Sequence, residues 1–438
     1  MDQTEALIIE TIDRHREEIL EFARDIYSHA ELGYKEFQTS GKFVKKMEQL
    51  GLRTEKGFAI TGVKAYLNED KKENASLALL GELDALRIPE HAFANPETNA
   101  AHCCGHHAQM AGVFGAALAL TVPEIAEKLD GQVVFFATPA EEYGEIEFKN
   151  QLRAQGKIKY GGGKCELLRI GAFDDIDLCL THHIRPGNEI LVGSGTGNGF
   201  VSKVIRVLGK ASHAAGAPEK GVNALSAASL GLQALGLNRE TFRDEDCVRV
   251  HPIITKGGNL VNVIPDEVVV ETLVRGKTIE AFTDAAKKTD RSFKAGAIAM
   301  GAKVEISTLP GYLPTLAEEA LPELKHAAEI SASGIPVIEA SGHAGGSTDV
   351  GDVQHLMPVY TFNTGGVKGG LHQIDFEVTD EEEAYIVTAK MFALAAYGLL
   401  KEKAQRSREL VDQYEPVFKN SAEYVEFMEQ FDSKEIFE

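Results

Sequence analysis

The stretch SLALLGELD, residues 76–84, decides the fold class. It runs through apolar and small side chains almost without a break and ends in carboxylates, as a strand covered on both faces would. Residues 132–138 (QVVFFAT) and 177–181 (DLCLT) are further patterns of this kind, and residues 108–120 have the apolar spacing of a helix. Strands that alternate with helices predict an α/β domain built around a mixed, mostly parallel sheet.

Polar residues follow each of these strands. Asp84 closes the first, Glu141 and Glu142 come just after the second, and His182 and His183 follow the third. The carboxyl ends of parallel strands meet at one edge of a sheet, where ligands bind. Adjacent acids at such an edge need neutralising cations if they are buried, whereas acids of a solvated loop do not. We therefore expect a ligand site at this edge.

The hexapeptide HCCGHH at residues 102–107 opens the helix that follows it and holds two thiols and three imidazoles. Thiolate and imidazole are ligands for borderline divalent ions such as zinc, manganese, cobalt or nickel. We predict that Cys104 and His106 anchor a metal site, because Gly105 lets the backbone turn so that both can face one ion. The start of a helix also favours the thiolate form of Cys104. Cys103 is interpreted as a packing residue.

A second domain is expected after the glycine-rich stretch at residues 187–200, which is typical of a hinge. The pattern beyond it is β-α-β-β-α-β, the order of a ferredoxin-like α+β domain. We predict that residues 199–308 form this domain and that it is inserted into a larger domain of residues 1–198 and 309–438. The charged and aromatic tail from residue 402 onward predicts helices packed on the surface.

Composition excludes several classes of partner. The net charge of −21 argues against nucleic acid and anionic membranes, since both need a basic surface. No apolar run of about 18 residues suggests a membrane span, and the acidic N-terminal stretch is unlike a signal peptide. Five cysteines form an odd count, which favours reduced thiols over a disulfide framework. We expect a cytoplasmic protein with neither nucleic acid nor membrane as a partner.

A series of motifs resembles the M20 metallopeptidases, and among them the amidohydrolases that cleave N-acyl, indole-acetyl or aminobenzoyl amino acids. The motifs run in order from about residue 15 to about residue 400, and as a set they are highly specific. They are GELDAL (81–86), HCCGHH (102–107), TPAEE (138–142), HIRPG (183–187), GKASHAA (209–215), NVIPD (262–266) and LHQIDF (371–376). The resemblance implies that residues 1–198 and 309–438 form a phosphorylase/hydrolase-like catalytic, metal-binding domain and that residues 199–308 form a lid and dimerisation domain. It also implies a small-molecule amide as substrate and a homodimer formed through the lid domain.

The resemblance also implies a centre of two divalent ions, zinc or manganese, in each subunit. Glu141 would be the general base that activates metal-bound water, and later the general acid. Asp84 would accept a hydrogen bond from a ligand histidine and fix its tautomer, although capping a helix is an equally good interpretation of this residue. His183 rather than His182 fits the family spacing His-x-x-Pro. The implied ligands are Cys104, His106, Glu142, His183 and His372.

Three residues of the expected lid match family positions near the substrate. His213 would reach the site of the partner subunit and stabilise the oxyanion there. Asn262 and Arg275 would lie near the substrate's carboxylate or oxyanion. From its own sequence context alone, His213 is more simply explained as a histidine of a surface loop.

The chain departs from the branch at three positions. The branch usually has Cys-Gly-His-Asp-x-His, whereas this chain has His107 and Gln109 at the last two polar places. His107 removes a negative charge beside the expected centre, which could change the metal preference or add a ligand. Glu82 stands where Asp is common. The polar stretch between Glu142 and Gly162 suggests a subgroup with its own substrate pocket.

Three alternatives stay open at this stage. The chain could be a dipeptidase or aminopeptidase of the same superfamily, although by resemblance those branches have His and Asp where this chain has Cys104. It could be a catalytically silent, metal-binding relative, which the presence of Glu141 and all five implied ligands disfavours. A structural zinc protein would group its ligands closely in sequence, whereas these ligands span residues 104 to 372.

Overall fold

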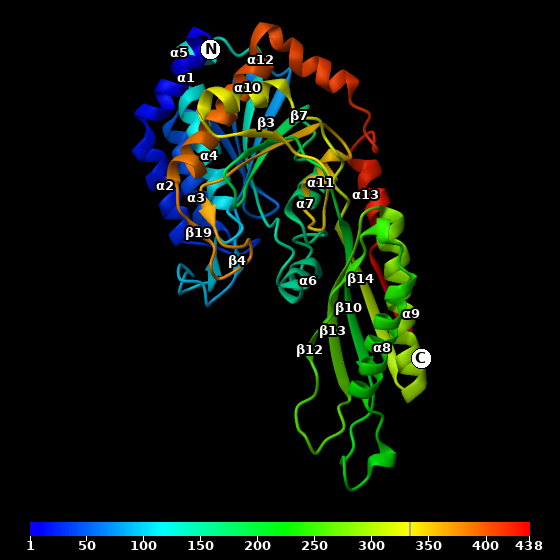
Figure 1. The fold of residues 1–438 in the computed structure, drawn as a ribbon. Helices are drawn as coiled ribbons and strands as arrows, with labels where there is room; N and C mark the ends of the chain where they lie inside the picture. The colour runs from blue at the N-terminus through cyan, green and yellow to red at the C-terminus, as the bar shows by residue number, and fades with distance from the viewer. Residues whose placement is uncertain (333) are drawn as a thin grey trace. The chain divides into compact units, whose positions relative to one another are not determined.

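The computed structural model describes residues 1–332 and 334–438, which form two compact units (Figure 1). The first unit comprises Met1–Gly195, Leu316–Gly342 and Asp352–Ser421. The second comprises Thr196–Thr315, His343–Gly351 and Ala422–Glu438. Each unit has its own sheet and its own buried core, so the chain leaves the first unit, completes most of the second and then returns.

The first unit is built on a mixed eight-stranded sheet, which confirms the predicted α/β class. β3 is parallel to both β6 and β7, β7 is parallel to β17, and β8 is parallel to β15. Antiparallel pairs join β1 to β2, β2 to β6 and β8 to β17. In sheet order the strands are β1 (Arg53–Phe58), β2 (Gly62–Leu67), β6 (Gln132–Thr138), β3 (Ser76–Glu82), β7 (Leu178–Ile184), β17 (Val359–Thr364), β8 (Ile190–Val192) and β15 (Val337–Glu339).

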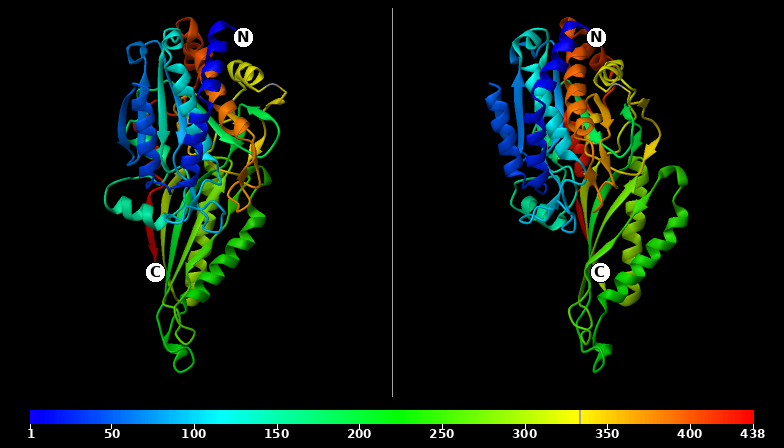
Figure 2. Two further views of the ribbon diagram at one scale, coloured as in Figure 1. Left: turned by 90° about the vertical axis from the view of Figure 1, so that its left-hand side faces the viewer. Right: turned by 60° about the vertical axis from the view of Figure 1, so that its left-hand side comes forward.

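The helix α4 (His106–Leu120) is buried along its whole length and forms the centre of this unit's core. It packs on β3 and β7 and is covered by α1 (Gln3–Arg14), α2 (Arg16–Ser28) and α12 (Thr388–Gln413) (Figure 2). The apolar face expected for residues 108–120 is therefore too narrow a description, since neighbours surround the helix on every side.

One helical stretch of the described chain, Glu382–Gln413, is long and apolar enough by composition to cross a membrane. Its most apolar window is 89% buried inside the protein, as in a core helix, so its composition is weak grounds for a membrane span. Its first turn, Glu382–Val387, is π-helical. The unit's other elements are α3 (Phe37–Gln49), α5 (Pro123–Ala126), α6 (Ile146–Ala154), α7 (Gly163–Arg169), α10 (Pro322–Ser331), β4 (Leu86–Arg87), β5 (Ala100–Ala101), β18 (Val367–Lys368) and β19 (Glu377–Val378).

The second unit has the β-α-β-β-α-β order expected from the sequence. Its antiparallel sheet places β13 between β10 and the short edge strands β11 and β12, while β14 pairs with the other side of β10. The helices α8 and α9 pack against each other along one face (Figure 1). In chain order the elements are β9 (Thr196–Gly197), β10 (Gly199–Leu208), α8 (Ala224–Asn238), β11 (Arg249–Val250), β12 (Ile253–Lys256), β13 (Glu267–Gly276), α9 (Ile279–Met300), β14 (Lys303–Tyr312) and β16 (His343–Ala344).

The C-terminal tail ends in a strand, so the prediction of a purely helical tail is wrong. After α13 (Ser421–Glu429), the segment β20 (Ser433–Phe437) pairs antiparallel with β14. The outer edge of β14 offers unpaired backbone groups, and the tail satisfies them. The second unit thus extends beyond residues 199–308, while its roles as lid and dimerisation domain stay predictions.

Candidate metal centre

The candidate centre lies in the first unit, where strands end and α4 begins. β3, β6 and β7 are parallel, so the residues that follow them share one edge of the sheet. Cys104 and His106 are placed there by Gly105, whose φ of +88° allows the sharp entry into α4. This φ is one that glycine adopts without steric cost.

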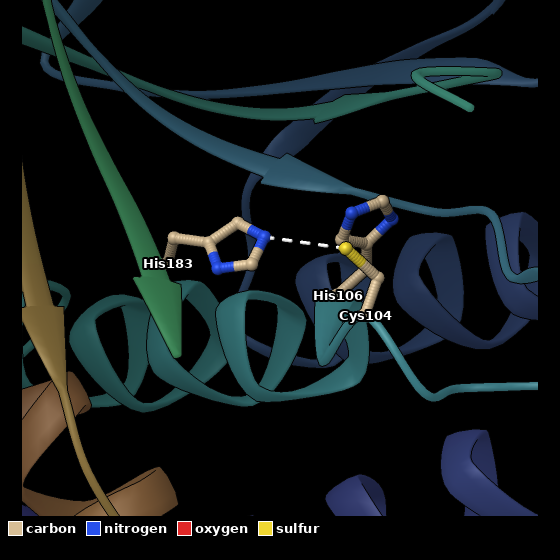
Figure 3. Close-up of side chains that lie close together, drawn as sticks. All are labelled: Cys104, His106 and His183. Carbon is tan, nitrogen blue, oxygen red and sulfur yellow. Dashed lines mark hydrogen bonds between the residues drawn. The ribbon is translucent and has the colours of Figure 1, made fainter. Parts of the chain in front are cut away.

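Cys104, His106 and His183 form the first group of possible ligands, with one donor atom from each within 4.8 Å of the others. Figure 3 shows the imidazole of His183, from β7, facing the thiol at the start of α4. The Cys104 Sγ to His183 Nε2 distance is 3.3 Å. His183 Nδ1 lies 2.7 Å from the carbonyl oxygen of Ile184. Because a carbonyl oxygen can only accept, this contact favours the tautomer with its proton on Nδ1, whose Nε2 can act as a ligand.

Cys104 also belongs to a second group, with Glu142 and His372. His372 Nε2 lies 3.2 Å from Cys104 Sγ and 3.1 Å from Glu142 Oε1. The loop that carries His372 is held by a hydrogen bond from its backbone N–H to the carbonyl of Cys103, at 2.9 Å. The structure therefore brings together all five residues that the resemblance implies as ligands, in two groups that share one thiol.

Asp84 connects the two groups. His106 Nδ1 lies 2.9 Å from the Asp84 carbonyl oxygen and 3.2 Å from Asp84 Oδ1, while the backbone N–H of Glu142 donates to Oδ2 at 2.9 Å. The carboxylate is fully buried. It contacts a ligand histidine and the backbone of a second candidate ligand, and it does not cap a helix, since Gly105 is the N-cap of α4.

The general base proposed from the sequence lies close to the first group. Glu141 is buried, and one of its carboxylate oxygens lies within 4.8 Å of ligand atoms of His106 and Glu82. The same cluster includes Lys164, a residue that was not predicted from the sequence. Its Nζ lies 2.5 Å from Glu82 Oε1, and both side chains are buried. In the sequence, Lys164 follows three glycines and precedes Cys-Glu-Leu-Leu, a context that does not indicate a buried ion pair.

The electrostatics of the cluster suit a cation. Burial and then the charge of Glu142 raise the pKa of Cys104 well above the usual 9.0. Burial opposes ionisation of His106, yet the carboxylate of Glu82 raises the pKa of this imidazole well above 6.5. His106 Nε2 is buried and has no hydrogen-bond partner in the part of the chain that the structure describes. Sulfur, imidazole and carboxylate donors around an unsatisfied buried nitrogen fit a borderline divalent ion.

The two adjacent histidines of β7 have different roles. His182 faces the core, where Nε2 lies 2.8 Å from the hydroxyl of Thr364 and the ring packs on Phe362. Burial, together with His183, holds the pKa of His182 well below 6.5. Successive side chains of a strand point to opposite faces, so only one of the pair can face Cys104.

Neither His107 nor Gln109 belongs to the two ligand groups found among the described residues. His107 is buried with Nε2 3.1 Å from the hydroxyl of Tyr385, and burial followed by His106 lowers its pKa to about 3. Gln109 Oε1 accepts from the backbone N–H of Glu82 at 2.9 Å, and its Nε2 donates to Glu82 Oε2 at 2.8 Å. His107 is thus a neutral core residue, whereas Gln109 holds Glu82.

The three residues expected near the substrate lie in the second unit. His213 is exposed, and its Nδ1 accepts from the backbone N–H groups of residues 215 and 216, at 3.2 and 2.9 Å. Asn262 is exposed, and its carbonyl accepts from the N–H of Ala214 at 2.9 Å. Arg275 is half-buried, with Nη1 3.3 Å from Ser347 Oγ.

Comparison with known proteins places these features in a family. Residues 78–397 of the 438 match the peptidase family M20/M25/M40. The chain belongs to this family. It is an M20-type hydrolase, a metal-dependent amidohydrolase or peptidase, and the resemblance drawn from the motifs is confirmed.

Relatives in the family differ in substrate. The mouse protein Xaa-Arg dipeptidase is 27% identical, over 90% of this chain and 85% of its own length. N-acetyl-L-cysteine deacetylase of Bacillus subtilis strain 168 is 24% identical, over 89% of this chain and 90% of its own length. A solved structure described as a dinuclear metal binding peptidase from the M20 family of Bacillus subtilis has a TM-score of 0.62 at 24% identity, covering 89% of this chain and 99% of that chain, which supports the fold.

Proposed function

We propose that this M20 protein hydrolyses the amide bond of N-acyl or aminobenzoyl amino acids. The observation that carries the proposal is the sharing of Cys104 between two groups of ligands, with Glu141 beside them. Two groups of ligands that share one thiolate would hold two divalent ions, zinc or manganese. The deacetylase among the relatives acts, by its name, on an N-acyl amino acid.

The ligands in this proposal are Cys104 for both ions, His106 and His183 for one, and Glu142 and His372 for the other. When bound, the ions would polarise the substrate carbonyl and lower the pKa of a water molecule to about 7. Asp84 keeps the imidazole of His106 oriented through Nδ1, as outer partners of metal ligands do.

Glu141 moves the proton. Its carboxylate takes a proton from the attacking water, whose oxygen bonds to the carbonyl carbon, and later delivers it to the nitrogen as the C–N bond breaks. The products are a carboxylic acid and a free amino acid. A buried carboxylate at a strand end suits this role, because the surrounding protein holds it in place.

Residues of the second unit would complete the site in a homodimer. His213 would stabilise the oxyanion in the site of the neighbouring subunit, and Asn262 and Arg275 would lie near the carboxylate or the oxyanion of the substrate. The exposure of His213 and Asn262 suits groups that meet another molecule.

A cytoplasmic location agrees with the free thiols of all five cysteines.

A dipeptidase is the second candidate, since the similarity to Xaa-Arg dipeptidase spans most of both chains. The test is a hydrolysis screen of the full chain reconstituted with Zn²⁺ or Mn²⁺, with N-acetyl amino acids, aminobenzoyl-glutamate and dipeptides as substrates. We expect turnover of N-acyl amino acids to exceed that of dipeptides. Faster cleavage of dipeptides would favour the second candidate, and no hydrolysis of any amide would overturn the proposal.

The role of Glu141 has its own test. Glu141→Gln should lower kcat by a factor on the order of 10²–10⁴ and leave the metal content near that of the wild type. Glu318→Gln is a matched control, because Glu318 lies in the same unit but bonds to Thr361 and Gln354 instead of the cluster. Activity that survives in Glu141→Gln would show that another group is the base.

A further inference from the structure

We propose that Glu82 is an additional ligand for the ion held by His106, and that Gln109 and Lys164 keep its carboxylate in position. The inference rests on the proposed two-ion centre and adds a sixth protein ligand to it. Glu82 is one of the residues at which the chain departs from its branch. It is the last residue of β3, and its side chain lies in the cluster.

The contact between Glu82 and His106 carries the inference. Glu82 Oε2 lies 3.1 Å from His106 Nε2. In the neutral form of this ring the proton lies on Nδ1, toward Asp84, and Nε2 then presents a lone pair to the carboxylate. Two electron-rich atoms at this distance are stable only with a cation or a proton between them. Nε2 is also the buried nitrogen that has no hydrogen-bond partner within the described residues.

The surroundings of Glu82 leave one position open for an ion. Lys164 Nζ binds Oε1 at 2.5 Å, and Gln109 Nε2 binds Oε2 at 2.8 Å. A carboxylate oxygen has two lone pairs, so Oε2 can accept from Gln109 and still coordinate an ion on the side of His106. The buried ammonium group of Lys164 compensates the charge of the Glu82 carboxylate, which would be costly to bury alone.

The two residues at which the chain departs from its branch, Glu82 and Gln109, contact each other. The backbone N–H of Glu82 donates to Gln109 Oε1 while Gln109 Nε2 donates back to the carboxylate, so the pair forms a closed contact. A glutamate is one methylene longer than the aspartate common in the branch. The carboxylate of this longer side chain contacts His106, and Lys164 compensates the charge that is buried with it.

The experiment is a metal titration of the full chain after removal of bound metal with a chelator. Co²⁺ is the probe, because its visible spectrum reports the number and kind of its ligands. In wild type we expect two bound ions per chain. In Glu82→Gln we expect one of the two affinities to fall by more than the roughly 10–100-fold that loss of a residue which only orients a ligand costs, together with an altered spectrum of that ion. Glu318→Gln should behave as wild type.

Each outcome decides a separate question. Two ions in wild type with unchanged affinities in Glu82→Gln would overturn the inference alone. A weaker site whose spectrum at saturation equals that of wild type would also overturn it, since Glu82 would then only orient His106. Fewer than two ions in wild type would overturn the proposed centre itself. If Glu82→Gln does not fold, Glu82→Asp keeps the charge beside Lys164 but shortens the reach, and it must show the same loss of affinity.

Discussion

Replacing Gly105 by alanine should damage both the fold of the first unit and its metal centre. Gly105 has a φ of +88°, and an added Cβ would come within 2.0 Å of Cγ2 of Ile184. The left-handed conformation costs an alanine about 1–2 kcal/mol, and overpacking a buried site costs about 1–3 kcal/mol more. We predict a total loss of about 2–5 kcal/mol, against a typical stability of about 5–15 kcal/mol.

The assay is urea unfolding followed by circular dichroism, with Gly51→Ala as the matched control. Gly51 also has a positive φ, +77°, but no atom of residues 1–332 or 334–438 lies within 4 Å of the added Cβ. The control should therefore lose only the conformational cost of about 1–2 kcal/mol. If Gly105→Ala loses no more than Gly51→Ala, the close approach of Ile184 to the Cys104–His106 turn is not a constraint on the fold.

Three further predictions concern other parts of the chain. His183→Ala should lower the amount of bound metal, whereas His182→Ala should lower stability and leave metal binding intact. Equal loss of metal in both variants would contradict the assignment of His183, and not His182, as the ligand. His107 has a pKa of about 3 when folded and 6.5 when exposed, so the unfolded chain binds the proton first and stability falls as pH drops below 6.5. At pH 5 the loss from this group is about 2 kcal/mol, and His107→Gln should remove it from unfolding curves measured at pH 7 and pH 5. Deleting residues 433–438 should uncover the edge of β14 and increase self-association in sedimentation experiments, whereas an unchanged sedimentation profile would show that the edge needs no cover.

The parts of the fold that local sequence determines were predictable. Continuous apolar runs predicted the three parallel strands whose carboxyl ends lie together, because a strand buried on both faces has apolar side chains at nearly every position. The order of elements in the second unit followed from alternation in the strands and helical spacing between them. The cluster of thiols and imidazoles at residues 102–107 was enough to predict Cys104 and His106 as metal ligands.

Other features depend on contacts between distant segments and leave no local trace. Lys164 reaches Glu82 only because α7 and β3 lie together in the fold, and a single lysine in sequence is usually a surface residue. The strand β20 forms by pairing with the edge of β14, which is distant in sequence. The short charged tail alone therefore does not predict a strand. The choice between His182 and His183 needed the family spacing, since alternation alone does not say which face of a strand is buried.

The count of ions per chain tests the proposed centre most directly. The measurement is elemental analysis of the dialysed, metal-loaded chain, made on wild type and on Cys104→Ser in parallel. We predict two ions per chain in wild type and a clear loss in the variant, because Cys104 is common to both ligand groups. An equal ion content in the two proteins, or no bound metal in wild type, would contradict it.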